Sequence, residues 1–465
     1  MNFIDRESEL RFLNQAYEAD SPQLVILYGR RRVGKTTLLR ESAKSKPAIY
    51  FMATRLPETQ QLMELGEVVG TFFQDPLLVE NGFRDWRQVL GYLARRPEPF
   101  IFILDEFPYL VDANPALTSL WQRGWDEGLS ASKAKIVLSG SSLAMMERET
   151  LSHTSPLYGR RTGQIKLEPF PFREARKFFP RYNVEDQIRA FAILGGIPYY
   201  LSRFDDGVPL LDNIRDQVFS RGAVLREEVE FLLREELREP RVYFAILQAL
   251  AQGKRKPSEI ANATGLAHGT LSKYISVLQR LALVSREVPA TETKPEKSKK
   301  GLYAVADPFV RFWFRFVLAQ RNLLEMDKSA RATQAMAERL DEFTAPIYEE
   351  ICRDEVNRGL LDEATGTNWT GARRWWDRTR EVDILAFSED RRLSLMGECK
   401  WSKKPVGVNI LEELEEDFPH TGLSAEGRKP LFALFSRSGF TSRLLDLAKQ
   451  RRDIILVNGL TVLPL

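Results

Sequence analysis

The segment that most constrains the fold is residues 29–36, whose sequence Gly-Arg-Arg-Arg-Val-Gly-Lys-Thr has the form G-x-x-x-x-G-K-[ST]. It follows the apolar run 24–28 and precedes the helix-favouring run 37–40. A buried strand, a glycine-containing loop and a helix N-terminus in this order favour a phosphate-binding loop over an ordinary glycine turn. The backbone N–H groups of such a loop surround a polyphosphate, and the helix dipole favours its negative charge. The segment therefore predicts an α/β domain that binds a nucleotide.

Individual side chains of this segment have expected roles. Lys35 is expected to reach the β- and γ-phosphates of ATP, and the Thr36 hydroxyl is expected to ligate Mg²⁺. ATP and Mg²⁺ are therefore the predicted cofactors. The predicted nucleotide-binding residues in and just after the loop are Gly29, Arg32, Val33, Gly34, Lys35, Thr36 and Thr37.

A second apolar strand, residues 100–104, ends in two carboxylates. Asp105 is expected to hold Mg²⁺ through its water shell, and Glu106 is expected to polarise the attacking water. An apolar strand that ends in two acids is a weak signal alone, because surface acids commonly follow strands. Its place downstream of a phosphate loop makes it the second half of an ATP-hydrolysing site.

Two further residues of this domain are candidates for contact with the nucleotide. Ser141 follows the apolar run 135–138 and is expected to sense the γ-phosphate, although a simple helix cap is the alternative. Arg160, preferred over Arg161, precedes a strand at 164–167. It is expected to contact transition-state charge, in cis or across a subunit interface, and the alternative is a solvated surface arginine.

Length and charge limit the classes of protein to which this chain can belong. Its 465 residues favour three or four domains over one. The formal net charge of +3 is small, so any surface for nucleic acid must be local. Two cysteines cannot form a disulfide framework, and a reducing cytoplasm is the expected compartment. The sequence has no signal-peptide pattern and no apolar run long enough to cross a membrane.

The motifs of the first domain resemble those of the archaeal-type ATPases on the AAA+/STAND side of the P-loop NTPases. The resemblance rests on Phe-Ile-Asp-Arg-Glu at the start, the phosphate loop, Leu-Asp-Glu-Phe at 104–107 and Leu-Ser-Gly-Ser-Ser at 138–142. It implies a sheet with an additional strand, in which the two carboxylates lie on the strand next to the phosphate-loop strand. It also implies that Arg6 lies near the base or ribose, and it makes a homo-oligomer an expected assembly.

A helical lid and a winged helix are expected to follow. The turn 195–198, Gly-Gly-Ile-Pro, resembles the lid of AAA+-like proteins, and a helix C-cap with a stop proline is the alternative. Two short helices at 257–264 and 268–281, joined by a glycine turn, precede a strand at 283–286 and a return strand at 303–305. This order predicts a winged helix-turn-helix with its wing at 289–300.

The winged helix is expected to contact DNA, and a role in packing between domains is the alternative. Hydroxyl and basic side chains on its second helix suit contacts with phosphates and base edges. The exposed positions are expected to be His268, Thr270, Ser272, Lys273, Ser276 and Arg280. The aromatic-rich helix at 307–316 is expected to pack between domains instead of stacking on bases.

The C-terminal region carries a second candidate site. Two strands joined by a short turn, 381–387 and 393–401, predict a hairpin. Glu398 and Lys400 are two residues apart and share one face, where Asp383 can meet them. Two acids and a lysine form a minimal site for Mg²⁺ or Mn²⁺, with Lys400 positioning a water. Alternating solvated charges are the alternative, and the three scattered histidines exclude a histidine-based metal site.

The order helix, hairpin, helix, strand, helix and strand resembles the PD-(D/E)xK nuclease superfamily, as do the sequences Glu-Val-Asp-Ile-Leu-Ala and Gly-Glu-Cys-Lys-Trp. The resemblance implies that an upstream glutamate, Glu349 ahead of Glu350, completes the metal site. One departure is Val382, which stands where the superfamily motif has proline.

Together these features predict an ATP-dependent DNA-processing protein with a metal-dependent nuclease-like domain. One alternative is an ATP-switched DNA-binding regulator or scaffold, and another is an ATPase that remodels a protein partner. No membrane partner is expected. The predicted domains are a P-loop ATPase at 1–167, a helical lid at 168–238, a winged helix at 239–320 and a nuclease-like α/β domain at 321–465.

Overall fold

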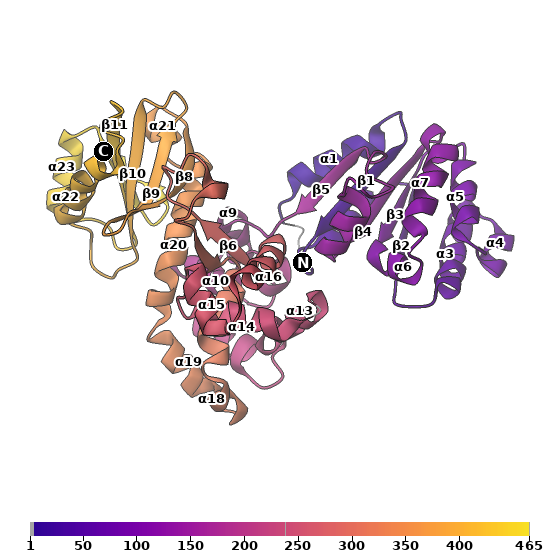
Figure 1. Ribbon diagram of the computed structural model, residues 1–465, viewed down its shortest axis with the longest axis horizontal. Helices are drawn as coiled ribbons and strands as arrows, with labels where there is room; N and C mark the ends of the chain where they lie inside the picture. The colour runs from indigo at the N-terminus through magenta and orange to yellow at the C-terminus, as the bar shows by residue number, and fades with distance from the viewer. Residues whose placement is uncertain (1–3, 238, 465) are drawn as a thin grey trace. The chain divides into compact units, whose positions relative to one another are not determined.

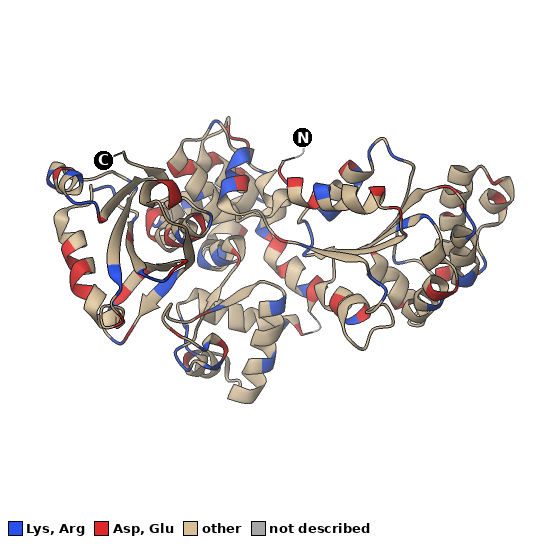
Figure 2. Ribbon diagram, turned by 90° about the horizontal axis from the view of Figure 1, so that it is seen from above, with Lys and Arg blue, Asp and Glu red and all other residues tan. Residues whose placement is uncertain are grey.

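The computed structural model describes residues 4–237 and 239–464 (Figure 1). The chain divides into two compact units. The first unit runs to Pro169 and includes the short segment Ile197–Tyr199. The second comprises Phe170–Gly196 and the chain from Tyr200 onward. Basic and acidic residues are interspersed along the elements of each unit (Figure 2), in keeping with the small net charge.

The first unit is built on a parallel sheet with the strand order β2-β3-β4-β1-β5. The predicted strands are confirmed, but one detail of the topology was wrong. The carboxylate strand β3 is not next to the phosphate-loop strand β1, because β4 lies between them (Figure 1). The strands are β1 (Gln23–Gly29), β2 (Ala48–Met52), β3 (Phe100–Asp105), β4 (Ala134–Gly140) and β5 (Gly163–Leu167).

Helices cover the sheet of the first unit because its central strands, β1, β3 and β4, are apolar on both faces. All six residues of β3 and all seven of β4 are buried. Such runs occur in parallel sheets that are covered on both sides. The helices and helical turns are α1 (Glu7–Glu18), α2 (Lys35–Ala43), α3 (Glu58–Phe73), α4 (Pro76–Asn81), α5 (Trp86–Ala94), α6 (Phe107–Ala113), α7 (Leu117–Glu127), η1 (Leu129–Ala131), α8 (Leu143–Met146) and η2 (Glu147–Leu151).

The second unit begins with short helices that lead to the winged helix. The aromatic stretch predicted to pack is buried, since Phe312, Trp313 and Phe316 are each at most 2% exposed. The helical elements are α9 (Phe172–Ala175), η3 (Arg176–Phe178), α10 (Val184–Leu194), α11 (Pro198–Leu201, of which the last two residues belong to this unit), α12 (Leu210–Ile214), η4 (Arg215–Phe219), η5 (Val224–Arg226), α13 (Glu228–Glu236), α17 (Pro308–Phe312), η7 (Trp313–Leu318), α18 (Arg321–Glu325) and α19 (Ser329–Ala337).

The winged helix has the predicted order of elements. Its helices bury an apolar face that includes Ile260, Leu271 and Ile275. Strands β6 and β7 pair antiparallel, with Val284 opposite Val305. The wing lies between these strands and includes the turn η6 (Pro295–Lys297). The other elements are α14 (Pro240–Ala251), α15 (Pro257–Thr264), α16 (His268–Arg280), β6 (Val284–Glu287) and β7 (Leu302–Val305).

A six-stranded mixed sheet with the order β13-β12-β11-β10-β9-β8 forms the C-terminal part. The predicted hairpin is β9 and β10, and β10, β11 and β12 pair in parallel. Strand β8 was not predicted. The elements are α20 (Leu340–Asn357), α21 (Asp362–Thr365), β8 (Trp369–Trp376), β9 (Glu381–Ser388), β10 (Leu393–Lys400), α22 (Val408–Asp417), η8 (Phe418–Thr421), β11 (Lys429–Ser436), α23 (Ser442–Gln450), β12 (Ile454–Asn458) and β13 (Thr461–Val462).

The wing is attached to this C-terminal sheet. Ala290, in the wing, is 7% exposed and belongs to the apolar cluster that contains Trp375 and Val382. Its backbone N–H donates to the carbonyl oxygen of Arg374 at 3.0 Å. The winged helix and the C-terminal sheet therefore share part of one core. In the described part of the chain, no helix is long and apolar enough to cross a membrane.

Candidate functional site

The phosphate loop connects β1 to α2 and has the backbone conformation that its glycine allows. Gly34 has φ +96°, a left-handed conformation that favours glycine. Lys35 is buried, and its Nζ donates to the carbonyl oxygens of Gly29 and Arg30 at 2.9 and 3.0 Å. The ammonium group thus lies over the loop where phosphates are expected. Val33 is fully buried and can contribute only its backbone.

Asp105 lies beside the first turn of α2, although β4 separates its strand from β1. The Thr36 hydroxyl donates to Oδ2 of Asp105 at 2.8 Å. Tyr50, on β2, donates to the same oxygen at 2.6 Å, which the sequence did not predict. Burial and the Asp105 carboxylate raise the pKa of Tyr50, so its hydroxyl stays protonated. Hydroxyl and carboxylate oxygens are ligands that Mg²⁺ prefers, so Thr36 and Asp105 are the residues that would hold it directly or through water.

Glu106 follows the end of β3 and is held by Ser141. Its φ of +55° places it in the left-handed region, an uncommon and strained conformation for glutamate. The Ser141 hydroxyl donates to Oε2 of Glu106 at 2.8 Å, and the Ser141 backbone N–H donates at 3.2 Å. Ser141, predicted to sense the γ-phosphate, therefore orients the predicted catalytic carboxylate.

Arg6 is buried at the carboxyl edge of the sheet. Its guanidinium donates to Glu9 at 3.0 Å and to the carbonyl oxygen of Glu168 at 2.6 Å. Glu168 follows Leu167, which pairs with Gly29 at the start of the phosphate loop. The structure therefore places Arg6 beside the strand ends that flank the loop.

Arg160 is not brought to the phosphate loop of its own chain. It precedes β5 at the amino edge of the sheet, where Thr162 bonds to Leu24, whereas the loop leaves the carboxyl edge. Its guanidinium makes a bidentate ion pair with Asp126, at distances of 2.8 to 3.2 Å. This position does not fit the predicted contact in cis. A contact across a subunit interface and the alternative, a surface arginine, here paired with Asp126, both stay open.

The turn predicted to resemble a lid contacts the phosphate loop. The guanidinium of Arg32 lies 4.4 Å from the centre of the Tyr199 ring. A Cβ placed on Gly34 would lie 3.8 Å from Pro198, so the two segments are in close proximity. Arg32 is thus held by a cation–π contact at the surface of the loop. Thr37, the third residue of α2, is also exposed.

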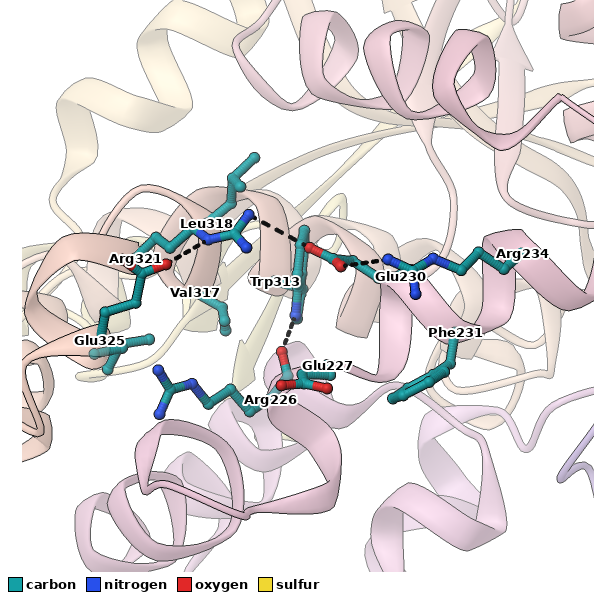
Figure 3. Close-up of a pocket in the computed structure, with 11 residues that line it drawn as sticks. Arg226, Glu227, Glu230, Phe231, Arg234, Trp313, Val317, Leu318, Arg321 and Glu325 are labelled. Atoms are coloured by element: carbon teal, nitrogen blue, oxygen red, sulfur yellow. Dashed lines mark hydrogen bonds and ion pairs between the residues drawn. The ribbon is translucent and has the colours of Figure 1, made fainter.

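A pocket of about 230 Å³ lies in the second unit between α13 and the aromatic stretch η7 (Figure 3). The indole N–H of Trp313 donates to the carbonyl oxygen of Arg226 at 2.7 Å. Glu230 pairs with Arg234 on its own helix and with Arg321 on α18, at 3.3 and 3.6 Å. These contacts join α13 to α18 and η5 to η7 around the pocket.

The second candidate site lies where β9 and β10 separate. Their pairing runs to Ile384 opposite Gly397, so the next positions are Asp383 and Glu398, on the same face of the hairpin. Oδ2 of Asp383 accepts a hydrogen bond from the backbone N–H of Cys399 at 2.9 Å. Lys400 Nζ lies 2.5 Å from Oε1 of Glu398. The structure therefore brings the predicted acid pair and lysine together.

Burial makes the charged forms of the two acids of this site unfavourable. Burial, followed by the Asp383 carboxylate, raises the pKa of Glu398 to about 7. Burial also raises the pKa of Asp383. Burial alone would lower the pKa of Lys400, but the Glu398 carboxylate outweighs it and the pKa is raised. A cation between two such carboxylates would relieve their repulsion, and one or two carboxylates with water are usual for Mg²⁺.

Glu349, on α20, is near this pair but does not join it. Burial and the charge of Asp383 raise the pKa of Glu349 to about 8. Across residues 4–237 and 239–464, no three histidine, cysteine, aspartate or glutamate side chains form a group that could hold a metal ion. Glu350, the second choice, is paired with Arg311 at 2.9 Å. The fit to a divalent cation therefore rests on Asp383 and Glu398.

The second helix of the winged helix, α16, presents the predicted face to solvent. The six positions expected to be exposed are all exposed. Ser272 and Ser276 donate to helix carbonyl oxygens one turn earlier. The wing adds exposed Lys294, Lys297 and Lys299.

Comparison with known proteins agrees with this architecture. Residues 3–204 match a family described as an ATPase domain predominantly from Archaea. Residues 244–286 match the arsR family of bacterial regulatory proteins, and residues 313–413 match a family of archaeal and bacterial proteins of unknown function. The second match covers α15, α16 and most of β6, and the third covers α20 and the β9–β10 hairpin.

Several individual proteins are similar to this chain. An uncharacterised protein of Methanocaldococcus jannaschii is 32% identical over 399 residues, which cover 86% of this chain and 87% of that protein. An uncharacterised ATP-binding protein of the same organism is 46% identical over 44 residues, which cover 10% of this chain and 75% of that protein. The structure of a Walker-type ATPase of Pyrococcus abyssi has a TM-score of 0.50 at 24% identity and covers 67% of this chain and 96% of that one. The phosphate loop, the Asp105–Glu106 pair and these matches together show that the chain belongs to the family of P-loop ATPases found predominantly in Archaea.

Proposed function

We propose that this ATPase is an ATP-dependent DNA-processing enzyme whose C-terminal sheet carries a metal-dependent nuclease-like site. The observation that carries the proposal is the placement of Asp383 and Glu398 side by side at the open end of the β9–β10 hairpin, with Lys400 on the same face. In this account the four segments divided near residues 167, 238 and 320 act as ATPase, lid, DNA-binding module and nuclease-like domain.

Contact with DNA is supported by the winged helix. Exposed Thr270 and Lys273 on α16 offer a hydroxyl and an ammonium group to phosphates or base edges, and the wing adds exposed lysines. The match to regulatory proteins of the arsR family covers this helix. Basic groups confined to α16 and the wing suit a local DNA surface on a chain of small net charge.

At the nuclease-like site, Asp383 and Glu398 would hold Mg²⁺ or Mn²⁺. When bound, the cation supplies electrostatic stabilisation of charge on the phosphate under attack. Lys400 lies beside Glu398 with its side chain 36% exposed, so its ammonium can hold a water for attack on the phosphodiester. The backbone N–H of Cys399 fixes the orientation of Asp383.

At the nucleotide site, Lys35 and the loop backbone would bind the phosphates of ATP, and Thr36 with Asp105 would hold Mg²⁺. Glu106, oriented by Ser141, would polarise the attacking water. Arg160 would act on the nucleotide of a neighbouring copy in a homo-oligomer, because its own strand end is remote from the loop.

A nuclease assay tests the proposal. Linear, nicked, branched and single-stranded DNA are incubated with the protein and Mg²⁺ or Mn²⁺, with and without ATP. We expect cleavage of at least one substrate, lost in Asp383→Ala. Cleavage that is equal in Asp383→Ala, or absent under every condition, overturns the nuclease assignment.

A second function, an ATP-switched regulator that binds DNA without cutting it, is favoured by one observation. The Lys400 ammonium already pairs with Glu398 at 2.5 Å, which is an internal substitute for a cation. This reading predicts salt-dependent DNA binding that survives Glu398→Ala, with no cleaved product. Stimulation of ATP turnover by a protein partner in place of DNA would favour a remodelling ATPase over both.

A further inference from the structure

A pocket of about 180 Å³ lies between the winged helix and the C-terminal sheet. The winged helix contributes Arg255 and Tyr303, helix α20 contributes Glu349 and Arg353, and strand β8 contributes Arg374. The pocket borders the nuclease-like site, because Arg353 donates to the carbonyl oxygen of Asp383 at 2.9 Å. It therefore connects the two parts of the second unit that the proposed function assigns to DNA.

Four arginines line this pocket, and their hydrogen-bonding capacity exceeds the contacts they make. Nη2 of Arg255 donates to Glu287 at 2.7 Å, but its buried Nε has no acceptor among the described residues. Arg353 lies 3.9 Å from Glu349, beyond hydrogen-bond range. Arg311 donates to Glu350. A guanidinium presents several N–H donors in a planar fork that matches the oxygens of a phosphate.

Arg374 extends this set of arginines towards Asp383. It makes an ion pair with Glu381, which lies two residues before Asp383 on the same face of β9. It also lies 3.9 Å from Glu287 of the winged helix, the partner of Arg255. Arginines and acids thus alternate from the winged helix to the nuclease-like site.

The size and lining of the pocket indicate which ligand it takes. Pockets that enclose whole small molecules typically start near about 300 Å³, so this smaller pocket suits part of a longer chain that extends beyond it. A DNA duplex, whose major groove alone is about 12 Å wide, cannot enter it. Basic groups combined with an aromatic side chain, here Tyr303, are typical of surfaces that bind single-stranded nucleic acid. Exposed Lys254 and Lys256 flank Arg255 and add positive charge beside the pocket.

We propose that this pocket binds the backbone of a single DNA strand and leads it from the winged helix to Asp383 and Glu398. Arg255 and Arg374 bind its phosphates, and Tyr303 stacks on a base. The inference rests on the proposed nuclease function and adds to it a substrate class, DNA with a single-stranded segment.

Binding of fluorescein-labelled oligothymidylate, measured by fluorescence anisotropy in EDTA, tests the inference without requiring cleavage. We expect Arg374→Gln to raise the Kd roughly tenfold, because one charge-assisted contact is lost. The slope of log Kd against log salt concentration should fall by about 0.7 for each phosphate contact removed. Arg255→Gln, on a different element, should give the same changes.

Arg373→Gln is the matched control. Arg373 is the neighbour of Arg374 on β8 but is exposed and does not line the pocket, so its replacement should change the Kd less than about twofold. Equal Kd values for Arg373→Gln, Arg374→Gln and Arg255→Gln overturn the inference. Arg374→Lys is a second variant that keeps the positive charge. Circular dichroism melting curves of Arg374→Lys and Arg374→Gln, compared with that of the wild type, identify a folding defect.

The outcome is separable from that of the proposed function. If cleavage depends on Asp383 but the Kd for the single strand is unchanged in Arg374→Gln and Arg255→Gln, only the assignment of strand binding to this pocket is overturned. Strand binding that depends on both arginines, without cleavage by the wild-type protein, overturns the nuclease assignment alone and leaves a strand-binding protein.

Discussion

Ser141 holds Glu106: its hydroxyl donates to Oε2 at 2.8 Å and its backbone N–H donates to the same oxygen at 3.2 Å. Glu106 is also in a left-handed backbone conformation, with φ +55°. A strained residue whose carboxylate is fixed by two donors is preorganised for one orientation. The structure thus supports a role for Ser141 that works through Glu106.

The first prediction concerns these two residues. Glu106→Gln should lower ATP hydrolysis by about 100-fold or more, because the base that polarises water is lost. Ser141→Ala should lower it roughly tenfold, since a hydrogen bond to a charged group is lost. Phosphate release measures both, and binding of a fluorescent ATP analogue should change little in either variant. Ser142→Ala, at the next position, is the control. Equal rates for the two serine variants would show that Ser141 does not orient Glu106.

The second prediction concerns Tyr50, which donates to Asp105 at 2.6 Å. Asp105 is fully buried, so loss of this donor removes a charge-assisted hydrogen bond from its carboxylate. Tyr50→Phe should lower the free energy of unfolding by about 1.5 to 3 kcal/mol. Tyr17→Phe is a matched control, because Tyr17 bonds only to the neutral Ser42 hydroxyl and should cost about 1 kcal/mol. Urea unfolding without nucleotide measures both, and a smaller effect for Tyr50→Phe would contradict the account.

The third prediction concerns pH. Burial and the Asp383 charge raise the pKa values of Glu349 and Glu398 from 4.5 to about 8 and about 7. Between the ordinary and the raised pKa, the folded protein binds more protons than the unfolded chain, so the free energy of unfolding falls as pH rises. The urea midpoint of the metal-free protein should therefore fall between about pH 5 and pH 9.

Glu398→Gln should flatten this dependence, whereas Glu389→Gln, in the exposed turn between β9 and β10, should not. A divalent cation should restore stability most at the alkaline end, where both carboxylates are ionised. A midpoint that rises over the same range would refute the assignment of buried, mutually repelling acids.

The fourth prediction concerns duplex DNA. Lys273→Gln on α16 and Lys297→Gln in the wing should each weaken duplex binding and reduce the slope of log Kd against log salt by about 0.9. Electrophoretic mobility shifts over a salt series measure this. Lys449→Gln, at an exposed position on α23, should leave binding unchanged. If all three variants bind duplex DNA equally well, the winged helix packs between domains and does not contact DNA.

Much of the fold could be predicted because the motifs coincide with strong local patterns. The phosphate loop lies between an apolar strand and a helix. Asp105 ends one apolar strand, and Glu398 follows the apolar part of another. Those patterns depend on neighbouring residues in the sequence. The order of strands does not, so the position of β4 between β1 and β3 could be learned only from the structure.

The unpredicted features all depend on contacts between distant residues. In strand β8, buried and exposed residues do not alternate regularly, because its pairing with β9 is irregular between Thr370 and Trp375. The two-residue period typical of a strand is therefore not visible in its sequence. Tyr50 has the pattern of an ordinary strand residue, and only the fold brings its hydroxyl to Asp105. In the same way, only the fold places Arg255 and Arg374 in one pocket. A sequence pattern specifies which face of a helix or strand carries a side chain, but it does not specify which distant residue that side chain contacts.

We propose that ATP controls DNA cleavage at Asp383 and Glu398. The most direct measurement is the rate of cleavage of DNA with single-stranded ends by wild type, Lys35→Ala and Asp383→Asn, with Mg²⁺ and with or without ATP. The account predicts ATP-dependent cleavage by wild type, loss of the ATP dependence in Lys35→Ala and no cleavage by Asp383→Asn. Cleavage by Asp383→Asn at the wild-type rate, or none by wild type, would contradict it.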